Sequence, residues 1–156
     1  MKRFFAIVLL CVAGILCSFE ANAIKYGVIG GTAFPGKTHP EAQTVWSAGG
    51  TLQVKLPLGF SVQPSVVYSF DSQGSLNMPV SLQWGPDLLV MRPFVDVAPH
   101  IGYAFSDQGD VCYGVSAGGG LEVWRLQVAC RYCWSYKDVV SNYRGVTLSV
   151  AFLFGR

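Results

Sequence analysis

The most conspicuous candidates for chemistry are two cysteines separated by two residues. Cys130 and Cys133 have the CxxC spacing of redox and zinc motifs. The residues around them alternate between apolar and polar, and that alternation predicts a β-strand. Positions three apart on a strand face opposite sides of the sheet. We therefore expect Cys130 to face outward and Cys133 inward, without CxxC chemistry.

A second candidate is a hydrolase-like triad. His100, Glu122 and a serine such as Ser116 could supply its base, acid and nucleophile. The same positions also fit a network of paired charges inside a small barrel, because buried charges need partners. We favour the network and expect no catalytic residues. Its expected members all face inward: Lys25, Lys55, Asp96, His100, Glu122 and Arg131.

Two further motifs are weaker. His39 and Glu41 supply two metal ligands, fewer than a closed site needs, so we expect no metal. The glycines at 118–120 suggest a phosphate loop, but no helix follows them, so we expect no cofactor. With a two-residue turn at 124–125, the first of these glycines falls opposite Arg131 and leaves room for that side chain.

The N-terminal residues read as a targeting segment. The initial Met is followed by two basic residues, Lys2 and Arg3, and then by an apolar stretch over 4–16. Ala21-Asn22-Ala23 is a small-x-small cleavage site. This pattern predicts a secretory signal peptide over 1–23 and a mature chain over 24–156. The alternative is an N-terminal membrane anchor, for which the apolar stretch is short.

Composition limits the remaining classes. Of 156 residues, 51% are hydrophobic and 13% are charged, about half the roughly 25% charge of soluble domains. Disorder is thereby excluded, and no basic run favours a nucleic-acid partner. Beyond residue 24 no apolar run is long enough for a transmembrane helix. The mature chain is then an exported soluble protein or a membrane β-barrel.

Period-two alternation favours the barrel. Over 126–137 the even positions are apolar or aromatic, and the odd positions are mostly polar or small. Such segments recur eight times, which predicts an all-β, eight-stranded, antiparallel up-and-down transmembrane barrel. The expected strands lie at about 24–34, 44–56, 60–70, 75–85, 92–105, 111–123, 126–137 and 145–155.

The two faces of these strands indicate which side meets lipid. The apolar face carries no Lys, Arg, Asp or Glu, so it is expected to face lipid, with the polar face inside. Aromatic residues fall near both ends of the apolar face, as in interfacial girdles. One group is Phe60, Trp84 and Phe154; the other is Trp46, Phe70, Phe105, Trp134 and Tyr136.

Connection lengths predict the orientation. Short turns are expected near 57–59, 86–90 and 124–125, and longer connections join the other strand ends. Membrane barrels keep short turns on the periplasmic side. The pattern therefore places both termini in the periplasm of a Gram-negative cell, with the barrel in the outer membrane.

The last strand resembles an assembly signal. It alternates apolar residues and carries an aromatic residue at its end, a pattern that the barrel assembly machinery reads. Its residues are Leu148, Val150, Phe152 and Phe154. The expected partners are therefore outer-membrane lipid and the assembly machinery, with other envelope proteins left open.

Four stretches, in order, carry a family resemblance. They are IKYGVIGGTAF at 24–34, AGGTLQVKLPLGFSVQPSVVYS at 48–69, SLNMPVSLQWG at 75–85 and RPFVDVAPHIGYAF at 92–105. Together they resemble the small outer-membrane β-barrel family of Bacteroidota, the PorT-like group. The chain departs from it at Val97-Ala98, where the family has a glycine, and in its shorter loops. The resemblance implies a fold and an envelope location but no single activity.

Three classes of function remain. The first is a non-enzymatic structural, assembly or interaction component of the envelope. The second is a narrow channel, which the small interior of eight strands disfavours. The third is a lipid-modifying outer-membrane enzyme, for which no catalytic set faces lipid. The sequence favours the first class.

Overall fold

The structure is a computed structural model that describes residues 24–35, 44–70, 74–105, 110–135 and 145–155. The expected signal peptide, the pair His39 and Glu41, and Tyr136 lie outside the described residues. In the described segments, no helix is long and apolar enough to cross a membrane.

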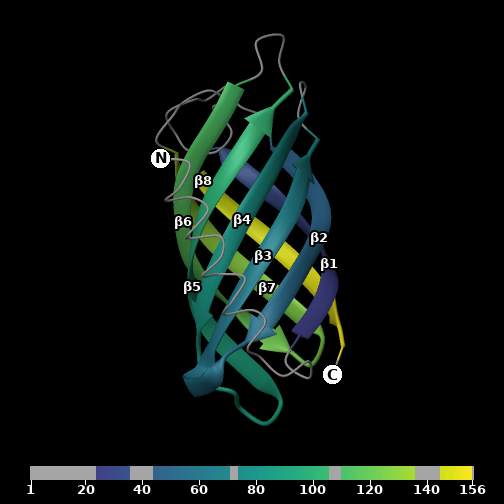
Figure 1. Ribbon diagram of the computed structural model, residues 1–156, viewed down its shortest axis with the longest axis vertical. Helices are drawn as coiled ribbons and strands as arrows, with labels where there is room; N and C mark the ends of the chain where they lie inside the picture. The colour runs from purple at the N-terminus through teal and green to yellow at the C-terminus, as the bar shows by residue number, and fades with distance from the viewer. Residues whose placement is uncertain (1–23, 36–43, 71–73, 106–109, 136–144, 156) are drawn as a thin grey trace, which may run out of the picture.

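Eight antiparallel strands form one closed barrel in chain order, with β1 pairing with β8 to close it (Figure 1). The fold expected from the alternation is confirmed, and each strand end lies within two residues of its expected position. The strands are β1 (Ile24–Pro35), β2 (Val45–Lys55), β3 (Phe60–Ser69), β4 (Ser75–Trp84), β5 (Met91–Ala104), β6 (Asp110–Val123), β7 (Leu126–Ser135) and β8 (Gly145–Phe154).

The barrel has two unlike ends. At the turn end, β1 begins and β8 ends, and three short connections join the strands. One is a single 3-10 turn, η2 (Pro57–Gly59), in which Leu58 has a φ of 64°. Another is the two-residue turn at 124–125, where Trp124 has a φ of 56°. The opposite end, where β1 connects to β2, is the loop end.

The register shows how strongly the strands tilt. A line of paired residues that starts at Ile24 returns to β1 at Phe34, ten residues further along. That stagger corresponds to a strand tilt of about 40°. On the way it passes through Val54, Val62, Leu82, Val97, Ala117, Tyr132 and Val146.

Aromatic side chains gather at both ends of the outer face. At the turn end the ring centroids of Tyr26 and Phe154 lie 5.9 Å apart, and Phe60 contacts Trp84. At the loop end further aromatic pairs pack together, and the ring centroids of Tyr132 and Trp134 lie 4.9 Å apart. In the described strands no Lys, Arg, Asp or Glu occupies an outward position. The two expected aromatic girdles are therefore present among the described residues, which do not include Tyr136.

Candidate functional site

Four glutamines meet in the interior of the turn half of the barrel. Gln63 donates to Gln127 at 2.9 Å and accepts from Gln83, while Gln53 and Gln127 both donate to the Gln83 Oε1 at 3.4 Å. All four are at most 2% exposed. An amide both donates and accepts, so these side chains bind one another directly, and among the described residues only the Gln53 Oε1 of this group has no partner. We call them the glutamine cluster.

A buried ionic group lies beside the glutamine cluster. Glu122 accepts from Lys25 at 2.6 Å and from Arg92 at 3.4 Å. Arg92 also donates to the Gly59 carbonyl and to Ser61 Oγ, each at 3.0 Å. Because the glutamines and these three charges are joined by hydrogen bonds, they form one unit that closes the turn half. We call it the polar plug.

The polar plug brings together part of the predicted network. Lys25 and Glu122, both predicted members, pair with each other. Arg92 was not among the predicted residues, although it shares the inward parity of Asp96 on β5. The glutamines were missed because an uncharged amide on an inward face carries no distinctive signal in a sequence.

Lys55 lies at the turn-end mouth of the interior, outside the plug. Its Nζ lies 3.1 Å from Oδ1 of Asp87, which also lies 3.5 Å from Nε of Arg92. Asp87 belongs to the β4–β5 connection and is 57% exposed at the side chain. An ion pair this open to water contributes at most about 1 kcal/mol. The Lys55–Asp87 pair therefore holds the β4–β5 connection against the rim of the barrel and contributes little to the stability of the core.

A second ionic pair lies further toward the loop end. Arg131 donates from Nε to Asp96 at 2.6 Å and from Nη1 to Ser149 at 3.2 Å. The Asp96 side chain is fully buried, and its Oδ1 has no hydrogen-bond partner among the described residues. Gly118 pairs with both Asp96 and Arg131 in the neighbouring ladders, which confirms the expected position of that glycine.

The triad hypothesis is wrong. His100 pairs with Gly114 in the β5–β6 ladder, whereas Glu122 pairs with Arg92. Gly114, which marks the level of His100, and Glu122 are eight residues apart along β6, a separation of about 27 Å on a strand. Ser116 Oγ donates to the Ala98 carbonyl at 3.2 Å. The three residues therefore cannot act together on one substrate.

The cysteines lie on opposite faces, as expected. Cys130 is exposed on the outer face, and Cys133 faces the interior with its Sγ 3.4 Å from Oγ1 of Thr147. Cys112 is buried. Within the described ranges, no three His, Cys, Asp or Glu side chains form a group that could hold a metal ion. CxxC chemistry is excluded by the strand geometry.

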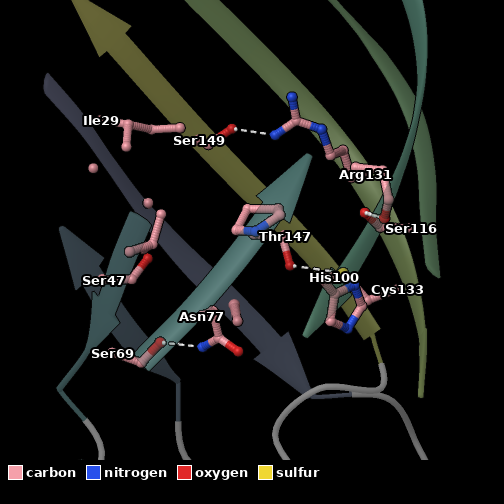
Figure 2. Close-up of a pocket in the computed structure, with 16 residues that line it drawn as sticks. Ile29, Ser47, Ser69, Asn77, His100, Ser116, Arg131, Cys133, Thr147 and Ser149 are labelled. Atoms are coloured by element: carbon pink, nitrogen blue, oxygen red, sulfur yellow. Dashed lines mark hydrogen bonds between the residues drawn. The ribbon is translucent and has the colours of Figure 1, made fainter. Parts of the chain in front are cut away.

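The loop half of the interior is not filled. A cavity of about 120 Å³ lies there, and Figure 2 shows the side chains around it. Small inward residues leave this space, among them Gly31, Ala33, Ser47 and Ala98. The expectation that side chains fill the lumen therefore holds for the turn half and is wrong for the loop half. His100, predicted as part of the charge network, lies at this cavity.

Comparisons with known proteins identify the fold. No family model and no curated protein matches this chain. Among solved structures, it is similar to the N-terminal β-barrel domain of Pseudomonas aeruginosa OprF, with a TM-score of 0.63, 14% identity, and 85% of this chain and 98% of that chain covered. It is also similar to Neisserial surface protein A, with a TM-score of 0.58, 13% identity, and 85% and 96% covered. At these identities the likeness shows a shared β-barrel fold.

Proposed function

We propose that this protein is a non-enzymatic outer-membrane β-barrel that serves as a structural or interaction component of a Gram-negative envelope. The outer surface supports a lipid environment. It is apolar and free of charge across the described strands, with aromatic pairs at both ends. Each exposed apolar side chain would cost free energy in water, about 25 cal/mol per Å². Closure of the sheet also gives the strands partners on both sides, as lipid requires.

The polar plug is the observation that carries the choice of class. It lies in the turn half, where its glutamines and the side chains of Arg92 and Glu122 are buried and hydrogen-bonded to one another. Eight strands leave an interior about as wide as its side chains. A closed interior supports a structural or binding role over that of a narrow transport channel.

The third class, a lipid-modifying enzyme, has little support. Its chemistry would need a catalytic set near the outer face or in an open interior. The residues that could form one, His100 and Glu122, lie at opposite halves of the interior. Glu122 instead pairs with Lys25 and Arg92.

The location and orientation belong to this proposal. The signal-like segment at 1–23 and the resemblance to the PorT-like barrels of Bacteroidota support export to the outer membrane. The short turns at one end support a periplasmic position for both termini. The alternating last strand, Leu148 to Phe154, supports insertion by the barrel assembly machinery.

Two measurements test the proposal. Because every strand is hydrogen-bonded on both sides, the barrel should stay folded in cold SDS, and boiled and unboiled samples should migrate differently. The protein should also remain in the membrane fraction after cell breakage. Release into the soluble fraction without detergent would refute the membrane location.

The closed interior is tested separately by conductance. Purified protein reconstituted into a planar bilayer should give no large, stable, ohmic steps. Such steps from pure protein would favour the channel instead. The heat-modified gel shift would still be expected in that case, so the two experiments separate the fold and location from the function class.

A further inference from the structure

We infer that the cavity in the loop half is a binding cup for a short-chain carboxylate, with Arg131 and Ser149 holding its anionic group. This inference goes beyond the proposed function and concerns only the interior of the barrel. The cup is closed at one end, because the polar plug fills the turn half below it. A ligand must therefore enter from the loop end.

The polar groups at the cup are rich in hydrogen-bond donors. Arg131 has five N–H donors, and its contacts with Asp96 and Ser149 engage two of them. Ser149 Oγ accepts from Arg131, so its own O–H is left to donate. Ser69 Oγ likewise accepts from Asn77 Nδ2 at 3.4 Å and retains its proton for donation. Such a surface suits a ligand that accepts hydrogen bonds.

Arg131 is held in a fixed orientation for this role. Asp96 binds its Nε edge at 2.6 Å and does not itself line the cavity. The terminal nitrogens therefore remain the part of the guanidinium that can meet a ligand, and this fork matches the two oxygens of a carboxylate. In Figure 2, the pair Arg131 and Ser149 lies on one side of the cavity, and Asn77 and Ser69 lie on another.

Size and the remaining lining select a short chain. Ile29, Val67, Pro79 and Ala98 supply an apolar wall, which fits a few methylene or methyl groups. The cavity measures about 120 Å³, and a cavity of about 150 Å³ can hold one benzene. A carboxylate of propionate size combines the required anionic group with an apolar tail that this wall can cover.

Cys133 provides a reporter inside the cup. It lines the cavity, and replacing Cys112 and Cys130 by alanine leaves it as the single thiol of the mature chain. In micelles, we expect negatively charged methanethiosulfonate ethylsulfonate to modify Cys133 faster than the positively charged trimethylammonium reagent. Propionate should slow the modification in a saturable manner. Propionamide, which has the same shape without the charge, should not.

A double variant links this protection to the guanidinium. Asp96→Asn with Arg131→Gln retains hydrogen-bonding groups and leaves no unpaired charge. We expect it to keep the heat-modified gel shift and to lose protection by propionate. The matched control, Lys55→Gln with Asp87→Asn, removes an ion pair at the opposite mouth and should keep full protection.

The following results of these experiments would contradict the inference. Equal protection by propionamide would show that the apolar wall alone binds and would overturn the carboxylate assignment. Failure of both reagents to modify Cys133 would mean that the cavity is closed to solutes from the loop end, and modification that propionate does not slow would mean that the cavity does not bind this carboxylate. Either result would overturn the cup. If the double variant loses its gel shift, Ser149→Ala replaces it, and unchanged protection in that variant would likewise contradict the inference.

Discussion

Gly118 lies directly opposite Arg131 across the β6–β7 ladder. A Cβ built on Gly118 would stand 2.1 Å from the Cys130 carbonyl oxygen and 2.7 Å from the Arg131 Cα. Both are backbone atoms, which cannot move aside as a flexible side chain can. The ladder at the buried ion pair therefore depends on a glycine.

This contact predicts the effect of one added methyl group. Gly118→Ala should lower the free energy of unfolding by about 1–3 kcal/mol, the cost of overpacking a close-packed interior. The measurement is a urea unfolding curve of the barrel in micelles. Gly50→Ala is the control, since a Cβ there meets nothing nearer than 4.0 Å. Equal effects of the two substitutions would contradict the assigned role of Gly118.

The fold and this glycine were predictable because both follow from local rules. Strict alternation fixes which residues face inward, and a two-residue turn at 124–125 fixes the register of β6 against β7. From those two facts alone, Gly118 must face Arg131. The rule that buried charges find partners predicted an inward network that includes Lys25 and Glu122, and the structure shows that these two pair with each other.

Arg92 and Asp87 show where local rules stop. Arg92 has the same inward parity as Asp96, but it stands at the start of β5, where the phase of a strand is least certain. Asp87 belongs to a connection, and only the folded chain shows that it reaches Lys55 and Arg92. Alternation contains no information about such a contact.

The cavity was unpredictable for a different reason. Whether an interior is filled depends on which inward residues of all eight strands share one level, and that is set by the stagger of ten residues around the barrel. The stagger sums the registers of eight ladders. In this barrel it brings the small residues Gly31, Ser47 and Ala98 to one level in the loop half.

The polar plug predicts a large difference between two charge-removing substitutions, one in the plug and one at the rim. Glu122→Gln leaves Lys25 and Arg92 without their buried anion, and should lower the free energy of unfolding by about 3 kcal/mol. Lys55→Gln breaks only the exposed rim pair and should change it by at most about 1 kcal/mol. Urea unfolding of both variants measures the difference. Similar losses would mean that the rim and the plug are equally stabilising.

The orientation can be tested with one cysteine at each end, in a chain whose native cysteines are replaced. Leu89 is fully exposed in the β4–β5 connection at the turn end, and Thr44 precedes β2 at the loop end. In intact cells, an impermeant maleimide should label Thr44→Cys but not Leu89→Cys. Permeabilising the outer membrane should expose both. The reverse pattern would place the termini outside the cell.

The last strand predicts a difference between assembly and stability. Phe152 and Phe154 lie on the outer face, where Phe154 packs against Tyr26 at 5.9 Å and against Phe152 at 5.0 Å. Replacing both by alanine removes apolar burial of roughly 1.5–3 kcal/mol per side chain. We expect the larger effect on insertion, because the machinery reads this strand before the barrel closes. The double variant should accumulate in the periplasm or be degraded.

The matched change lies on the inner face of the same strand. Thr147→Ala with Ser149→Ala removes the hydroxyls that contact Cys133 and Arg131, while it leaves the outer face intact. Because the contacts of those hydroxyls with β7 form only as the strands pair, this variant should fractionate with the membrane nearly as the native protein does. If the two double variants insert equally well, the outer face of β8 is not the signal, since a strand read by its apolar face must distinguish them.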